Sequence, residues 1–248
     1  MDNNSKNIIS LRPNPDCFED INIMKKLGIN CIPLPMLEFK IKKPPTKEMQ
    51  SNVSGIVITS KRSLDAVELF YSSFNNSFFK KPVFCIGKKT AESARKVGFK
   101  KIISGNSNAL ELIKIMKKSY TYDKRNYLWL SSKQVSKDLR KYLDKSEINL
   151  IKHDIYEMNE VSKFSQNTID LISSGKIDGI MTMSKRTLKN FKNLLKKYDI
   201  WEHHKEINLF SISYSVSNSV RGTWKKKFVP DEPNNSKMME TIKLFKGI

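Results

Sequence analysis

Short polar turns rich in serine, threonine and basic residues recur directly after apolar runs, and they are the residues best suited to chemistry. Five such turns occur, at 59–62, 87–90, 104–106, 184–186 and 211–215. Each is predicted to lie at the carboxyl end of a strand, where ligands bind in open α/β sheets. Hydroxyls, helix N-terminal N–H groups and nearby basic side chains suit an anion with several contact points. The alternative for each turn is that it only caps a helix.

Other signatures of catalysis are scarce in the chain. The adjacent His203 and His204 cannot turn both rings to one side of a helix or strand, which argues against a metal site there. The sequence contains no GxxxxGKS/T, GxGxxG, GxSxG or HExxH motif. This removes the usual signatures of phosphate-loop, dinucleotide-binding, serine-hydrolase and zincin sites.

The length and composition of the chain bound its class. Its 248 residues are enough for one large domain or two modest ones. No apolar run approaches the ~18 residues of a membrane span, and the first residues lack the apolar stretch of a signal peptide. The three cysteines, Cys17, Cys31 and Cys85, have no CxxC spacing. They fit a reducing compartment, so we expect a cytoplasmic protein.

The chain is strongly basic, with 38 lysines and 7 arginines against 25 acidic residues and a net charge of +20. Such a charge suits a polyanionic partner, either a nucleic acid or a small substrate with many carboxylates. A base composition that favours AT-rich codons would also produce many surface lysines, so charge alone does not decide. Aromatic residues do not interleave with the basic runs, and no RNP or KH pattern occurs, which argues against RNA.

Three segments recur in the same order at about half the length of the chain. The longest match pairs GIVITSKRSL at 55–64 with GIMTMSKRTL at 179–188, an offset of 124. The shorter matches, with offsets of 126 and 119, pair 86–87 with 212–213 and 29–32 with 148–151. Their shared order predicts an internal duplication.

Each repeated unit has the pattern of a strand, a turn and a helix. An apolar run such as GIVIT meets a Ser-Lys-Arg turn, and a segment of helical period follows, with the serine at the N-cap position. PVFCIG is followed by such a segment too, and Gly98 is expected to end that helix. Further strands, each followed by a helical stretch, are expected at KKIISG, NYLWLSS and INLFSIS. Strands alternating with helices predict parallel sheets, so we expect two α/β domains.

Two extended segments interrupt this alternation at equivalent places in the two units. They cover residues 34–43 and 152–161, and prolines in and beside the first prevent a helix there. If both segments cross between domains, residues 44–151 form one domain, and residues 1–33 and 162–248 form the other. The expected fold is therefore α/β, with two parallel-sheet domains related by internal duplication and joined by a two-stranded linker. The first domain is discontinuous in sequence.

These segments, taken in order, resemble the uroporphyrinogen-III synthase family. The opening SLRPNPDCFEDINIMKKLGINCIPLPMLEF resembles the family's Arg-Pro pair, helix, glycine and Pro-rich linker. GIVITSKRSLDAV, CIGKKTAESARKVGF and ISGNSNALELI are similar to its first-half turns and helices, and HDIYEMNEV to its linker strand. MTMSKRTLKNF and FSISYSVSNSV fit its second half. The resemblance covers nearly the whole chain.

The resemblance implies a cytoplasmic lyase of haem biosynthesis that uses no cofactor. Its substrate would be hydroxymethylbilane, a linear tetrapyrrole with eight carboxylates. The reaction expels the terminal hydroxyl as water and forms an electrophilic azafulvene. It then closes the ring through a spiro intermediate, with inversion of the last pyrrole. An octa-anion gives the basic chain a partner without a nucleic acid or a membrane, and we expect a monomer.

The resemblance and the polar turns together indicate one acid and a set of binding residues. Tyr156 matches the linker tyrosine that the family is thought to use near the departing hydroxyl, and packing within a strand is its alternative role. His153 lies three residues earlier on an extended strand and is expected to face the opposite side. Ser213 and Val216 depart from the glycine and threonine that are frequent in the family. The expected substrate-binding residues are Arg12, Thr59, Ser60, Lys61, Arg62, Thr90, Ser184, Lys185, Ser213 and Ser215.

A binding module is the alternative to an enzyme. In that hypothesis the chain is a non-enzymatic, two-lobed α/β protein that holds a polyanionic ligand, and only the family resemblance argues against it. Incubation with hydroxymethylbilane, followed by analysis of the oxidised porphyrin isomers, would separate the two hypotheses.

Overall fold

The protein, as seen in a computed structural model, divides into two compact units. The described residues are 5–106, 108–118, 125–135, 137–143 and 147–246. One unit comprises Met1–Phe39 with Asn159–Ile248, and the other comprises Lys40–Met158. The boundaries between the units fall inside the two extended segments that interrupt the strand–helix alternation. In the described part of the chain, no helix combines the length and the apolar character that crossing a membrane requires.

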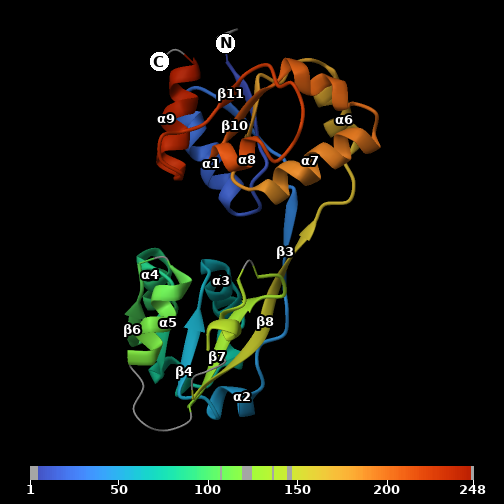
Figure 1. Ribbon diagram of the computed structural model, residues 1–248. Coiled ribbons are helices and arrows are strands. Elements are labelled where there is room, and N and C mark those ends of the chain that lie inside the picture. The colour runs from blue at the N-terminus through green and yellow to red at the C-terminus, as the bar shows by residue number, and fades with distance from the viewer. Residues whose placement is uncertain (1–4, 107, 119–124, 136, 144–146, 247–248) are drawn as a thin grey trace. The chain divides into compact units, whose positions relative to one another are not determined.

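The first unit is built on a parallel sheet with both faces covered. Its strand order is β11 (Lys227–Phe228), β10 (Asn208–Ser211), β9 (Gly179–Thr182), β1 (Asn7–Ser10) and β2 (Asn30–Pro33), each pair parallel. Helices α1 (Asp16–Lys26) and α9 (Asn235–Lys246) share one core with Ile8, whereas α6 (Gln166–Ser173) and α7 (Lys185–Lys197) share another with Ile9 (Figure 1). Neighbouring strand residues thus point to opposite faces, as the two-residue period of a strand requires.

The second unit also has a largely parallel sheet. Its strand order is β3 (Leu37–Ile41), β8 (Ile148–Glu160), β7 (Arg125–Ser132), β4 (Gly55–Ile58), β5 (Pro82–Cys85) and β6 (Lys101–Ser104), with parallel pairing from β8 through to β6. Helix α5 (Ala109–Lys118) packs on this sheet through Leu112 and Met116. Helix α3 (Lys61–Leu69) packs against α4 (Lys88–Val97) and against strands β4 and β7, and α2 (Lys47–Ser51) precedes β4.

Strands β3 and β8 run across the boundaries between the units. They pair with each other, and the backbone N–H of Lys42 donates to the carbonyl of Ile155 at 2.8 Å. The extended segment expected at 152–161 begins earlier than the sequence indicates, because β8 starts at Ile148 and pairs with β7 as far as Tyr156. Tyr156 therefore belongs to the sheet of the second unit.

The helix ends follow the expected chemistry. Ser60 and Ser184 are extended and accept backbone N–H bonds from the first turns of α3 and α7. Gly98 ends α4 with φ +113°. This conformation is unfavourable for any residue that has a side chain. The helical stretch expected after the strand at 125–132 is only a 3₁₀ turn, η3 (Leu139–Tyr142). Leu139 and Leu143 still reach the core, because one turn suffices to bury both.

The remaining helical turns are short. They are the 3₁₀ helices η1 (Tyr71–Ser73), η2 (Phe78–Lys80) and η4 (Trp201–Glu206), and the helix α8 (Tyr214–Ser217). Ser213 caps α8 by accepting the N–H of Val216 at 3.4 Å. The strand at 207–213 is therefore followed by a single turn rather than by a long helix.

The two glycines that begin the repeated motif have the same packing environment. A Cβ on Gly55 would lie 2.8 Å from the Tyr127 ring, and a Cβ on Gly179 would lie 2.6 Å from the Phe210 ring. In each case an aromatic side chain of the neighbouring strand lies against the glycine. The glycine of GIVIT and GIMTM is therefore needed for close packing, since a side chain there would overpack the core.

We predict that Gly179→Ala lowers the free energy of unfolding by about 1–3 kcal/mol, because Phe210 must move to admit the methyl group. Chemical denaturation of the purified protein measures this loss. The same substitution in a Phe210→Leu background should cost clearly less, since the smaller side chain leaves room. An equal cost in both backgrounds would mean that the ring is not what excludes a side chain at this position.

Candidate active site

A pocket of about 490 Å³ opens in the second unit beside the carboxyl ends of β4, β7 and β8. Its polar lining consists of Thr59, Ser60, Asn108, Ser132, Gln134 and Tyr156. Its apolar lining consists of Ile86, Ala109, Trp129, Val135 and Leu139. Lys137 completes the described lining. Hydroxyl groups and flat apolar side chains together suit a ring-shaped ligand with polar substituents.

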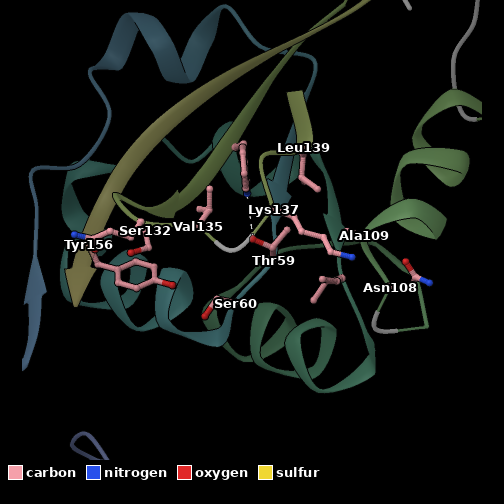
Figure 2. Close-up of a pocket in the computed structure, with 12 residues that line it drawn as sticks. Thr59, Ser60, Asn108, Ala109, Ser132, Val135, Lys137, Leu139 and Tyr156 are labelled. Atoms are coloured by element: carbon pink, nitrogen blue, oxygen red, sulfur yellow. Dashed lines mark hydrogen bonds between the residues drawn. The ribbon is translucent and has the colours of Figure 1, made fainter. Parts of the chain in front are cut away.

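Tyr156 reaches this pocket through an irregularity in strand pairing. Ser131 pairs with Asp154 but Ser132 pairs with Tyr156, so β8 bulges by one residue there. A bulge re-aims the side chains beyond it. The Tyr156 side chain is nearly buried, at 6% exposed, and its phenol points toward Ser60 (Figure 2).

The environment of Tyr156 favours a protonated phenol. Burial raises the pKa of Tyr156, while a hydrogen bond with Ser60 and the positive charge of Arg62 act in the opposite direction. Because the ordinary phenol pKa is near 10, a raised pKa keeps the proton on Tyr156 throughout the neutral range. The group is therefore a proton donor rather than a base near pH 7.

Thr59 and Ser60 are fixed by their own hydrogen bonds. The Trp129 indole N–H donates to Thr59 Oγ1 at 3.2 Å, the dashed line in Figure 2. Ser60 Oγ accepts the backbone N–H of Arg62 at 3.2 Å, as the N-cap of α3. An N-cap that accepts through its oxygen keeps its own O–H proton for another acceptor.

His153 lies outside the pocket lining, although strand alternation is not the reason. The bulge between His153 and Tyr156 interrupts the two-residue period on which the expectation of opposite faces rested. Instead, His153 Nε2 lies 2.9 Å from the carbonyl oxygen of Lys43, so its ring is directed toward the backbone that follows β3.

A second pocket, of about 440 Å³, lies in the first unit and is lined by Arg12 and Ser184 among others. The Arg12 guanidinium is held by Asp20, 2.6 Å from Nη1, and by Asp16, 3.3 Å from Nη2. Asp20 is fully buried and also accepts the hydroxyl of Ser10 at 2.7 Å. Burial raises the pKa of Asp20, and its bonds to Ser10 and Arg12 oppose this. Arg12 is thus a rigid, largely neutralised cation.

The other expected binding residues line neither of these two pockets. Arg62 pairs with Asp65, with 3.3 Å between Nη1 and Oδ2, and Thr90 is buried within α4. The rest are Lys61, Lys185 and Ser215, which are exposed, and Ser213, which is half-buried. Among the described residues, no group of three or more His, Cys, Asp or Glu side chains is arranged to hold a metal ion.

Sequence reasoning missed four residues that matter to the first pocket. Trp129 and Ser132 end a strand whose apolar run was recognised, but only the strand pairing brings them beside β4. Asn108 follows the polar turn at 104–106, and Lys137 lies in a connection without regular periodicity. The pair of serines that ends β7 is the available signal for Ser132, and the sequence offers no such signal for Lys137.

Comparisons with known proteins bear on the family to which the chain belongs. The family model described as uroporphyrinogen-III synthase HemD matches residues 21–240. No curated protein sequence matches the chain. The family match covers most of the chain and therefore disfavours the alternative of a non-enzymatic binding module.

Two solved structures share the fold. The uroporphyrinogen-III synthetase of Helicobacter pylori 26695 is 12% identical, with 97% of this chain and 99% of that chain covered and a TM-score of 0.64. A mutant uroporphyrinogen III synthase of the extremely thermophilic bacterium Thermus thermophilus is 11% identical, with 98% of each chain covered and a TM-score of 0.57. Together with the family match, this identifies the chain as a member of the uroporphyrinogen-III synthase family, a cyclising lyase of porphyrin biosynthesis.

Proposed function

We propose that the pocket beside Tyr156 is where this chain acts on hydroxymethylbilane, with Tyr156 as the acid that assists loss of the hydroxyl group. The observation that carries the proposal is a nearly buried phenol among hydroxyl groups in a pocket with an apolar wall. The substrate already contains its leaving group, so the enzyme has mainly to fold it, hold its two ends together and protonate the departing oxygen. Orientation of this kind can supply much of the acceleration.

The proposed proton transfer begins at the Tyr156 hydroxyl. Its proton passes to the departing oxygen, which leaves as water, and the substrate becomes a protonated azafulvene cation, whose charge balances that of the phenolate. The Ser60 hydroxyl donates to the phenolate oxygen so formed, and the charge of Arg62 favours the same anion. After ring closure through the spiro intermediate, the pyrrole that was attacked loses one proton, and the phenolate recovers it. Tyr156 is thereby regenerated and no net proton is consumed.

The proposed substrate-binding residues differ in their position relative to the two pockets. Thr59 and Ser60 line the same pocket as the acid and are expected to contact the reacting ring. Ser184 and Arg12 line the pocket of the first unit, where Arg12 is held by two carboxylates and can act mainly through its remaining N–H groups. The remaining candidates are Lys61, Arg62, Thr90, Lys185, Ser213 and Ser215, whose contacts with carboxylates depend on substrate segments outside the two pockets.

We also propose that the two units are the two domains of the enzyme, derived by duplication and joined by the strands at 34–43 and 152–161. Support comes from the division of the chain and from the shared Gly-to-Ser motif, in which an aromatic ring packs on the glycine and the serine caps the following helix in both units. The chain is proposed to act as a cytoplasmic monomer, with hydroxymethylbilane rather than a nucleic acid as its anionic partner and with no cofactor. The buried free thiols of Cys17, Cys31 and Cys85 fit a reducing compartment.

We predict that Tyr156→Phe lowers turnover by up to the ~10²–10⁴-fold that a general acid contributes, while substrate binding changes little. The measurement is incubation with hydroxymethylbilane, followed by quantitation of the oxidised porphyrin isomers. Spontaneous closure should then shift the products toward the uninverted isomer. Tyr142→Phe is the matched control, because Tyr142 is exposed in η3 and lines neither pocket. Full activity of Tyr156→Phe would make Tyr156 a packing residue, and lost binding with intact turnover would make it a substrate clamp.

We predict that Ser60→Ala reduces turnover roughly 10–100-fold, since a hydrogen bond to a charged group is worth about 1.5–3 kcal/mol. It should also cost about 1 kcal/mol of stability as a lost N-cap. Ser165→Ala separates the two effects, because Ser165 caps α6 by accepting the N–H of Thr168 at 3.2 Å and lies in neither pocket. The proposed role of Ser60 fails if the two variants lose equal stability and neither loses turnover.

A further inference from the structure

We infer that Lys137 binds a carboxylate side chain of the pyrrole ring that carries the hydroxymethyl group, and so fixes which ring faces Tyr156. This inference rests on the proposed function of the pocket. Of the described residues that line it, Lys137 is the one with a formal charge. It is contributed by the connection between β7 and β8, the two strands whose pairing positions Tyr156.

Lys137 is exposed, and the described surroundings leave its ammonium group open to an anion from outside the protein. No aspartate or glutamate is present in the described lining of the pocket, and in the described part of the chain Lys137 forms no ion pair. The neighbouring Asp138 is engaged elsewhere, because its Oδ1 accepts the Nε–H of Arg140 at 2.9 Å and the Arg140 backbone N–H at 3.1 Å. The ammonium group of Lys137 thus remains available to a ligand carboxylate.

Two other cations of the same unit differ in this respect. Arg62 pairs with Asp65, and Lys152 pairs with Asp154. A substrate carboxylate would have to compete with a protein carboxylate at each of those positions. At Lys137 it would not, so the gain from a charge-assisted hydrogen bond is not offset by the loss of an existing one.

The shape of the pocket determines which part of the substrate Lys137 meets. Ile86, Trp129 and Leu139 form apolar walls suited to the faces of a pyrrole ring. In Figure 2 the Lys137 side chain extends toward Ala109, away from the Tyr156 phenol and Ser60. A ring between these walls can turn its hydroxymethyl group to Tyr156 and a carboxylate-bearing side chain to Lys137. Lys137 is therefore a positioning and specificity residue, not the acid.

The first test separates binding from turnover. Lys137→Gln should raise KM roughly 10–100-fold, the effect of one charge-assisted hydrogen bond, and change kcat by no more than a few fold. Lys137→Arg should restore most of the affinity, and Lys141→Gln, an exposed residue of η3 outside the pocket lining, should behave as wild type. Thermal melting checks that each variant is folded. An unchanged KM in folded Lys137→Gln overturns the inference.

The second test identifies the ring. Hydroxymethylbilane analogues carry one carboxylate converted to a primary amide, either on the ring with the hydroxymethyl group or on an internal ring. For the analogue with the amide on the hydroxymethyl ring, wild-type enzyme should lose as much affinity as Lys137→Gln loses for the normal substrate. Lys137→Gln itself should bind that analogue almost as well as it binds the normal substrate, because the contact is already absent. Equal losses for all analogues in the variant would overturn the assignment of Lys137 to this ring.

The two proposals can fail separately. If Tyr156→Phe loses turnover while Lys137→Gln binds normally, the inference about Lys137 is wrong and the proposed function stands. If Tyr156→Phe is fully active, the proposed acid is wrong. A raised KM in Lys137→Gln with dependence on the ring would then still support the carboxylate contact.

Discussion

The one-residue bulge in the pairing of β7 with β8 is the constraint on which the candidate site depends. The sheet sets the positions of Ser60 and Trp129, since β4 and β7 are hydrogen-bonded neighbours with fixed register. Tyr156 joins them because the pairing shifts between Ser131 and Ser132, so that Tyr156 rather than Ile155 lies opposite Ser132. Without the extra residue in β8, the side chains of Ile155 and Tyr156 would exchange faces of the sheet. A buried phenol on a strand with neighbours on both sides is held in place, as a proton donor requires.

The distribution of charge is the second organising feature. Protein carboxylates near the site are held by protein cations, as with Asp65 by Arg62 and Asp138 by Arg140. The described lining of the pocket itself consists of hydroxyls, amides and apolar side chains, with one lysine. A substrate with eight carboxylates brings its own negative charge, so an acidic lining would repel it. Neutral hydrogen-bond donors hold such a substrate without binding it too tightly for release, which suits a reaction limited by orientation.

The sequence predicts the local elements well because their signals are local. Strand, turn and cap at GIVITSKRS follow from apolar runs and an N-cap serine, and Gly98 ends its helix as expected. Tyr156 could be identified only by resemblance, since nothing in its own segment distinguishes an acid from a packing residue. Lys137 and Trp129 could not be foreseen, because strand order and an irregular connection bring them to the pocket. The bulge left no pattern in the residue types, so the argument from alternation about His153 had the wrong basis.

The two copies of the repeated motif differ in what their capping serine bonds. Ser184 Oγ lies 2.8 Å from Thr187 Oγ1, which in turn lies 2.9 Å from Thr182 Oγ1, so the hydroxyls of that turn satisfy one another. In the other copy the residue equivalent to Thr187 is Ser63, whose hydroxyl donates to the carbonyl of Leu130 at 2.8 Å. Ser63 is therefore committed to β7, and Ser60 can bond Tyr156 instead. The same capping serine closes a local network in one unit and supports a phenol in the other. The difference lies in the residue three positions after the serine. Thr187 bonds back to Ser184, whereas Ser63 bonds to Leu130 of β7.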